Sequence, residues 1–337
     1  MNNSFNRSLL IIPVPQVEES INSYLTRVLQ SNGYKKTSYI NSILQISKEF
    51  ENNLILDQEK IVKLSVLLQE EKLRELYFSN SIILMCMNNT YVSKYGFLNR
   101  IIRICPKCLK EGPYHRNIWG LTGYTACHKH NCLMLSHCEC GKGIKSLNVD
   151  PLFCTCGKDY RLINIIDVKQ NKDNHNIFLY LRMMDKENQY NNSDSNLLCS
   201  LPVDAAIELM FRFSKVVLNL NRVRTNTNSQ AYFKDTILLH SLLDEVYRGF
   251  SSWPRNFQHL LKRLDYSIFN DTLIGLLNDL RGAPFSAVNY EISVYLKQRT
   301  YQIQLGMTEF NNEIVDLLIK SMSQMSDAKI TRSGNED

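Results

Sequence analysis

The stretch CPKCLKEGPYHRNIWGLTGYTACHKH, residues 105–130, decides how the middle of this chain folds. It opens with two cysteines on one knuckle and ends with a second knuckle that carries one cysteine and two histidines. Two ligands on each of two knuckles can close a tetrahedral zinc site. We predict such a site at Cys105, Cys108, Cys127 and His130. His128 competes for the fourth place, but the two-residue gap before His130 lets both ligands of that knuckle face one ion.

Two further cysteine pairs follow, CECG at residues 138–141 and CTCG at residues 154–157. The gap of one residue within each pair is tighter than the usual gap of two. Glycine adopts the backbone conformations that such a tight knuckle needs, and Gly141 and Gly157 supply it. We predict a second zinc site made by Cys138, Cys140, Cys154 and Cys156. Cys132 and His137 lie between the two sites and could substitute as ligands.

Both predicted sites have four protein ligands, whereas a catalytic zinc keeps one position open. We therefore expect two structural Zn²⁺ ions per chain and no enzymatic activity, with a zinc hydrolase as a remote alternative. Eight of the ten cysteines lie between Cys105 and Cys156, and this clustering favours metal over disulfides in a cytoplasmic protein. Of the other two cysteines, we expect Cys86 in the core, and the sequence has no second cysteine close to Cys199.

The remaining pattern predicts a mostly α-helical protein. A stripe of Ile21, Leu25 and Val28 at helical spacing marks the first helix, which stops at Asn32-Gly33. Candidate helices at 37–50 and 58–68 permit a helix-turn-helix-like unit. We divide the chain into an N-terminal helical domain (1–104), a tandem zinc-binding module (105–160), a connecting segment (161–200) and a C-terminal helical domain (201–337). Later helices are predicted at 177–184, from 202 to 217, and at 232–249, 253–264, 272–280, 286–301 and 309–322.

Charge and hydropathy limit the class of partner. The 337 residues carry a net charge of +6, and no apolar run is long enough to span a bilayer, so we expect a cytoplasmic protein without a membrane partner. Local basic tracts could hold the phosphates of DNA or RNA, or could simply be solvated helix faces. Their candidate contact residues are Arg100, Arg103, Arg212, Lys215, Arg222, Arg224, Arg255, Lys262 and Arg263.

Several short motifs occur in a characteristic order. The N-terminal ones are Pro13-Val14-Pro15, Glu18-Glu19-Ser20-Ile21, Ser23-Tyr24-Leu25, Arg27 and Asn32-Gly33; the later ones are Cys105-Pro106-Lys107-Cys108-Leu109, Trp119, the Cys127–His130 knuckle, Leu133 and Cys138-x-Cys140-Gly141. In this order, residues 10–160 resemble the TniQ family, the target-selection subunits of cut-and-paste DNA transposons. The chain departs from the family at Ile21, where Leu is usual, at Tyr24, where Trp is common, and in the narrow gap of its second cysteine group.

The resemblance implies a non-enzymatic adaptor that recruits an AAA+ ATPase and the transposase to a marked DNA target. The motif Ser252-Trp253-Pro254-Arg255-Asn256-Phe257 resembles a helix start in the branch associated with CRISPR-guided transposons. In that branch the adaptor is a bacterial homodimer attached to Cascade and its guide RNA, and it meets target DNA indirectly. The alternative is a protein that reads an attachment site directly by sequence.

Overall fold

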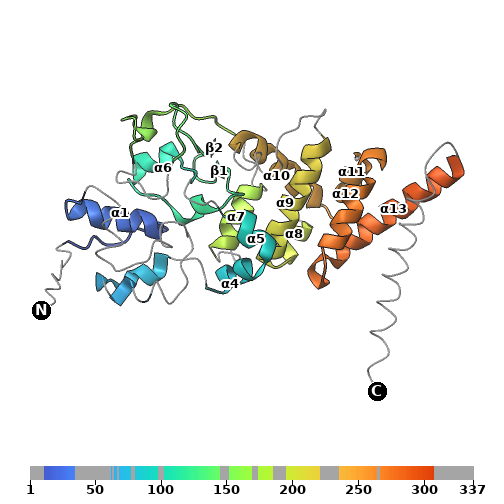
Figure 1. The fold of residues 1–337 in the computed structure, drawn as a ribbon, viewed down its shortest axis with the longest axis horizontal. Coiled ribbons are helices and arrows are strands. Elements are labelled where there is room, and N and C mark those ends of the chain that lie inside the picture. Colours follow the sequence, from blue (N-terminus) through green and yellow to red (C-terminus); the bar gives the residue numbers. More distant parts are fainter. Residues whose placement is uncertain are drawn as a thin grey trace, which may run out of the picture. The chain divides into compact units, whose positions relative to one another are not determined.

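The computed structural model describes residues 11–34, 62, 64–66, 68–76, 80–97, 102–144, 152–168, 174–184, 195–220, 235–263 and 266–306. These residues are mostly helical, as the sequence predicts, with one two-stranded sheet among them (Figure 1). The chain forms two compact units, Met1–Phe257 and Gln258–Asp337. No helix in the described part is long and apolar enough to cross a membrane.

The first helix, α1, spans Ile21–Ser31 and matches the predicted one. The hydroxyl of Ser20 caps it by accepting a hydrogen bond from the Ser23 N–H at 3.2 Å. Its predicted apolar stripe is buried, with Leu25 only 1% exposed. At the other end Asn32 exchanges two side-chain hydrogen bonds with the backbone of Ile11, which ties the extended lead-in to the end of the helix.

The rest of the N-terminal section contains η2 (Glu71–Leu76), α4 (Asn80–Asn88) and α5 (Thr90–Tyr95). The sequence pattern did not reveal α4 and α5, although Cys86 is buried as expected. The described residues between 58 and 68 are helical, but the candidate helix at 37–50 lies outside the described residues. The helix-turn-helix-like arrangement therefore stays a prediction.

The cysteine-rich section is built from short elements. They are α6 (Pro106–Glu111), η3 (Asn117–Gly120), the antiparallel strands β1 (Ala126–Cys127) and β2 (Cys132–Leu133), and η4 (Tyr160–Leu162). Isolated backbone bridges attach it to its surroundings, among them the pair of Glu19 with Arg116. Through that pair the lead-in to α1 becomes part of the same structure as the cysteine knuckles.

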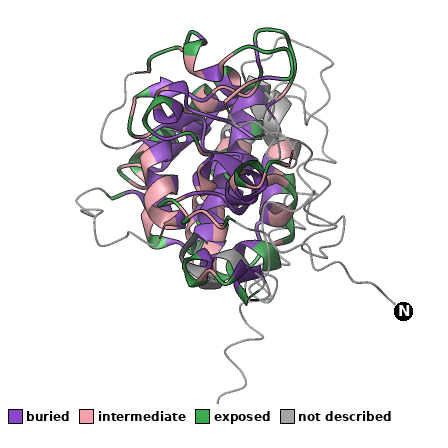
Figure 2. Ribbon diagram, turned by 90° about the vertical axis from the view of Figure 1, so that its left-hand side faces the viewer, coloured by how far each residue is buried: buried purple, intermediate pink, exposed green. Residues whose placement is uncertain are grey.

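Four helices complete the first unit: α7 (His175–Met183), α8 (Leu197–Ser200), α9 (Val203–Leu220) and α10 (Thr236–Phe250). Helices α9 and α10 pack side by side (Figure 1). Most of their apolar residues are buried. In Figure 2 the buried residues lie mainly on the helices at the centre of the view, and many exposed residues lie on the surrounding loops. The rings of Phe213, Phe250, Trp253 and Phe257 form one aromatic cluster, with centroids 4.9–5.8 Å apart.

Helix α11 (Arg255–Arg263) starts at the end of the first unit, and the second unit continues with α12 (Tyr266–Asp279), η7 (Ala283–Phe285) and α13 (Ser286–Gly306). Helices α12 and α13 pack against each other. The stripe of Val288, Ile292 and Leu296 on α13 is buried. Both α12 and α13 extend beyond their predicted ranges, and the predicted helix at 309–322 lies outside the described residues.

A buried polar cluster joins the cysteine-rich section to α7 and α10. The Thr125 hydroxyl lies 3.0 Å from His175 Nε2 and 3.0 Å from His240 Nδ1. The Asn176 carboxamide oxygen accepts the backbone N–H groups of Thr125 and Ala126 at 2.9 and 3.0 Å. Burial lowers the pKa of both histidines, that of His240 to about 4. Both imidazoles are therefore neutral in the folded protein at neutral pH.

This cluster predicts a loss of stability in mild acid. A histidine whose pKa is lowered by folding takes up its proton in the unfolded state first, so stability falls as the pH drops from about 6.5 towards 4. Between pH 7 and 5.5 the free energy of unfolding should therefore fall. We expect this fall to be about 1 kcal/mol smaller in His240→Gln, because glutamine does not titrate. Urea unfolding of both proteins at several pH values measures this, with metal content determined at each pH. Parallel pH profiles would contradict it.

Candidate metal centres

The structure brings together the side chains of the first predicted site. The imidazole Nδ1 of His130 lies 3.5 Å from Cys105 Sγ, 3.2 Å from Cys108 Sγ and 3.5 Å from Cys127 Sγ. The sulfurs of Cys108 and Cys127 are 3.6 Å apart. Ligands bound tetrahedrally to zinc at 2.0–2.3 Å lie about 3.3–3.8 Å from one another. The cluster therefore has the dimensions of a tetrahedral metal site, and its sulfurs are too far apart for disulfides.

Local backbone structure positions these ligands. Cys105 caps the N-terminus of α6, and its sulfur accepts the Cys108 N–H at 3.4 Å. Pro106 occupies the first turn of the helix, where its missing N–H costs nothing. Cys127 ends β1, directly opposite Cys132 on β2. Cys132 Sγ lies 3.6 Å from Cys105 Sγ, next to the cluster but outside the group of four whose ligand atoms are all within 4.8 Å of one another.

A carboxylate selects His130 over His128. Glu111, at the end of α6, lies 2.9 Å from Nε2 of His130, so the opposite nitrogen, Nδ1, faces the sulfurs. Such a carboxylate fixes the tautomer and the ring orientation of a metal-bound histidine. His128 instead lies 2.6 Å from the Tyr124 hydroxyl and stacks on Tyr180. The ligand pattern in the sequence did not reveal Glu111, although its place three residues after Cys108 on a helix puts both side chains on one face.

The second group, Cys138, Cys140, Cys154 and Cys156, also has all four sulfurs within 4.8 Å of one another. Cys138 and Cys156 are 3.7 Å apart, and Cys140 and Cys154 are 3.6 Å apart. His137 instead lies 2.9 Å from the hydroxyl of Ser136 and is not in the group.

The two knuckles of this group repeat one another. Cys138 N–H donates to the Lys142 carbonyl, as Cys154 N–H donates to that of Lys158, at 2.8 and 2.9 Å. Gly141 and Gly157 both adopt the left-handed conformation, with φ of 83° and 88°, which is available to glycine at little cost. The lysine of each knuckle reaches the other: Lys142 donates to Thr155 at 3.2 Å, and Lys158 pairs with Glu139. The group is therefore a symmetric pair of hairpins.

The two clusters differ in exposure. All three cysteines of the first cluster are buried, whereas Cys140 and Cys156 of the second are exposed. Protonation also differs among the four cysteines of the second cluster. The backbone N–H of Cys156 lowers the pKa of Cys154, and burial raises the pKa of Cys138. Metal binding requires every ligand thiol to lose its proton, so metal and protons compete at this cluster.

The candidate nucleic-acid residues fall into four groups. Arg103 is buried and donates hydrogen bonds to the Thr122 carbonyl and, at 3.2 Å, to the Thr236 hydroxyl, so it lies inside the fold. Arg212 is half-buried, with an ion pair to Glu208 at 2.7 Å. Four side chains are exposed, namely Lys215, Arg255, Lys262 and Arg263, while Arg100, Arg222 and Arg224 lie outside the described residues.

Comparison with known protein families gives a match to part of the chain. Residues 10–134 match the TniQ family model. The matched region includes the lead-in, α1 and the first cysteine cluster, and it ends before Cys138. This match supports a role in transposition, at the step of target selection. No curated protein matches the chain.

The geometry predicts which histidine binds metal. His130→Ala should remove one metal ion per chain, because three thiolates alone leave the buried site incomplete. His130→Cys should retain that ion in a four-cysteine site, and His128→Ala should leave the metal content unchanged. Elemental analysis of the purified proteins measures this. Loss of metal in the His128 variant but not in the His130 variant would overturn the assignment.

The difference in exposure predicts two rates of metal release. Exposed thiolates react with chelators and oxidants more readily than buried ones. With a chromophoric chelator in excess, we expect one ion to leave quickly and the other at least about tenfold more slowly. Cys140→Ser should remove the fast phase and spare the slow one. A variant that loses the slow phase instead would reverse the order of the two sites.

Proposed function

We propose that this chain, a TniQ family protein over residues 10–134, is a non-enzymatic adaptor of DNA transposition. It links a target-marking complex, which we propose to be Cascade with its guide RNA, to the AAA+ ATPase and the transposase of the element. It acts as a homodimer in the bacterial cytoplasm and meets target DNA indirectly. The observation that carries this proposal is the family match, which spans the first cysteine cluster and the elements attached to it.

Both clusters bind Zn²⁺, and both ions are structural. Three sulfurs with one imidazole, and four sulfurs, are donor sets that suit zinc. Four protein ligands leave the ion no open position for a substrate. Zinc binding supplies about 10 kcal/mol or more of folding free energy in small structural sites. That energy holds together a section whose strands are only two residues long.

The distribution of charge supports an adaptor over a direct reader of DNA. A zinc ion with three thiolates carries a charge of −1 and one with four carries −2, so the loaded clusters offset the basic residues around them. Lys107, Lys129 and Lys158 are each paired with a carboxylate. Arg103 is buried. These four basic side chains of the described residues are therefore paired or enclosed and do not offer free positive charge to DNA phosphates.

One feature favours the alternative, in which the protein reads an attachment site itself. Helix α11 exposes Arg255, His259, Lys262 and Arg263 within nine residues. A short helix with this many basic side chains can hold phosphates and reach base edges in a major groove.

Filter binding of duplex DNA to the isolated protein at several salt concentrations separates the two functions. An adaptor should bind weakly and without sequence preference, and a patch of three or four ionic contacts should lose most of its affinity by physiological salt. Lys262→Ala with Arg263→Ala should then change binding no more than the matched control Lys72→Ala. Site-selective binding at physiological salt, typically about 10³-fold above random DNA and lost in the double variant, would establish the direct reader instead.

A further inference from the structure

A fifth cysteine lies against the first cysteine cluster. The sulfur of Cys132 is 3.6 Å from that of Cys105, and both side chains are 0% exposed. Cys132 is outside the group of four ligands, and neither the two metal sites nor the family match gives it a role. A buried free cysteine usually packs as a small apolar group. Contact with a ligand sulfur indicates a further role.

We propose that the Cys132 thiol donates an S–H···S hydrogen bond to the metal-bound sulfur of Cys105. Cys132 is then a positioning residue of the first metal site, which acts on the ion through Cys105, and it is not a spare ligand. The inference rests on the proposed zinc site, because metal binding is what removes the proton of Cys105.

Metal binding fixes the direction of this hydrogen bond. Between two thiols either sulfur could donate. Zinc binds cysteine as the thiolate, which can accept a hydrogen bond but has no proton to give. A cysteine outside the ligand set carries its proton at neutral pH, so Cys132 is the donor. A hydrogen bond to a charged acceptor is also stronger than one between neutral groups.

The backbone holds Cys132 from two sides. On β1 its partner is Cys127, itself a predicted ligand. On the other side Cys132 forms a backbone bridge with Asp167, and the adjacent Leu133 N–H donates to the Ile166 carbonyl at 2.8 Å. The thiol is therefore carried by a segment that is paired along both edges, and its place beside the cluster is fixed.

The backbone also places Cys105 next to this segment. Ile104 exchanges two backbone hydrogen bonds with Leu135, at 2.9 and 2.8 Å, so the chain before α6 runs beside the continuation of β2. The Cys105 sulfur accepts the Cys108 N–H at 3.4 Å. With the Cys132 thiol it has a second donor. Two donors at fixed positions limit the orientations that are open to this sulfur.

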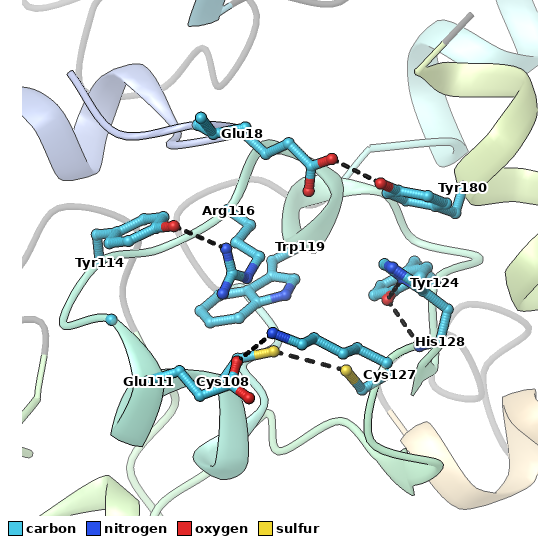
Figure 3. A pocket seen from close by; sticks show the side chains of 13 residues that line it. Glu18, Cys108, Glu111, Tyr114, Arg116, Trp119, Tyr124, Cys127, His128 and Tyr180 are labelled. Carbon is cyan, nitrogen blue, oxygen red and sulfur yellow. Dashed lines mark hydrogen bonds and ion pairs between the residues drawn. The ribbon is translucent and has the colours of Figure 1, made fainter. Parts of the chain in front are cut away.

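The other two sulfurs of the cluster have a different environment. Cys108 and Cys127 line a pocket of about 400 Å³, together with aromatic side chains such as Trp119 (Figure 3). Cys105 and Cys132 are not among the residues that line it. Water in such a pocket can donate hydrogen bonds to its walls. The enclosed Cys105 depends on donors from the protein, so the loss of one donor should affect it most.

The histidine ligand of the same site has a comparable support, since Glu111 lies 2.9 Å from Nε2 of His130. Loss of a group that holds a ligand in this way typically weakens metal binding by about 10- to 100-fold. A thiol is a weak donor. For loss of the Cys132 donor we therefore expect the lower end of that range, about tenfold.

Two substitutions separate the donor from the space that it fills. Cys132→Val removes the donor and keeps the site filled, whereas Cys132→Ser keeps a donor. Both are made in the Cys140→Ser protein, so that the first site alone is measured. In competition with a chromophoric chelator, the valine variant should bind zinc about tenfold more weakly, and the serine variant should stay within about twofold of its parent. The matched control Cys199→Val should leave the affinity unchanged.

Cobalt supplies a signal that a packing role would not change. With Co²⁺ in the first site, the charge-transfer absorption from thiolate to metal depends on the hydrogen bonds that the sulfurs accept. This band should shift in Cys132→Val and in Cys132→Ala, and it should return towards the parent position in Cys132→Ser. Its intensity should stay that of three sulfur ligands in all of them.

Three results would overturn the inference. An unchanged affinity and an unchanged band in Cys132→Val would make the thiol a space-filling group. Equal losses in the valine and serine variants would assign the effect to packing. Complete loss of the ion in every Cys132 variant, with the ion kept in His130→Ala, would make Cys132 a ligand. A parent protein that binds no metal would contradict the proposed zinc site as well, whereas the three results above leave that site in place.

Discussion

The convergence of three sulfurs and one imidazole between residues 105 and 130 is the constraint on which the first unit depends. Those four side chains come from the cap and first turn of a six-residue helix, and from a two-residue strand with the turn that follows it; these elements are too short to be stable by themselves. Once they are tied to one point, η3 and the turn after β1 are fixed as well. The lead-in to α1 pairs with Arg116 of this segment, so α1 is oriented by the same cluster.

A buried polar network connects that cluster to helices α7 and α10. The Thr125 hydroxyl, two residues before Cys127, meets His175 of α7 and His240 of α10 in a buried polar network. Arg103 makes a similar connection, since its guanidinium bridges the Thr122 carbonyl and the start of α10. Buried hydrogen bonds of this kind contribute much less to stability when one partner shifts. They therefore favour a single arrangement of the segments that they join. The metal cluster and the polar network together hold the cysteine-rich section against α7 and α10.

The sequence predicted what depends on local spacing. The eight side chains of the two clusters could be chosen because each ligand type is rare and its gaps are short, and α1 could be found from its apolar stripe and its cap. Features that depend on contacts between distant parts of the chain could not be predicted from the sequence. In the sequence, Arg103 looks like one more basic residue of a tract, and only the folded structure shows that its side chain is buried. Glu18 and Tyr180, which are 162 positions apart, carry no mark of their contact in the sequence.

The two hairpins of the second cluster resemble the two subunits of a symmetric dimer, but they are joined in one chain. Each half supplies two sulfurs, and each lysine contacts the opposite half. A separate copy of one half would have to find its partner by diffusion, whereas the tether of thirteen residues between Cys140 and Cys154 gives the pair a high effective concentration. The tether therefore contributes to metal affinity without touching the metal. Its length influences that affinity through the effective concentration, and this makes it a point at which the strength of the site can be tuned while every ligand is kept.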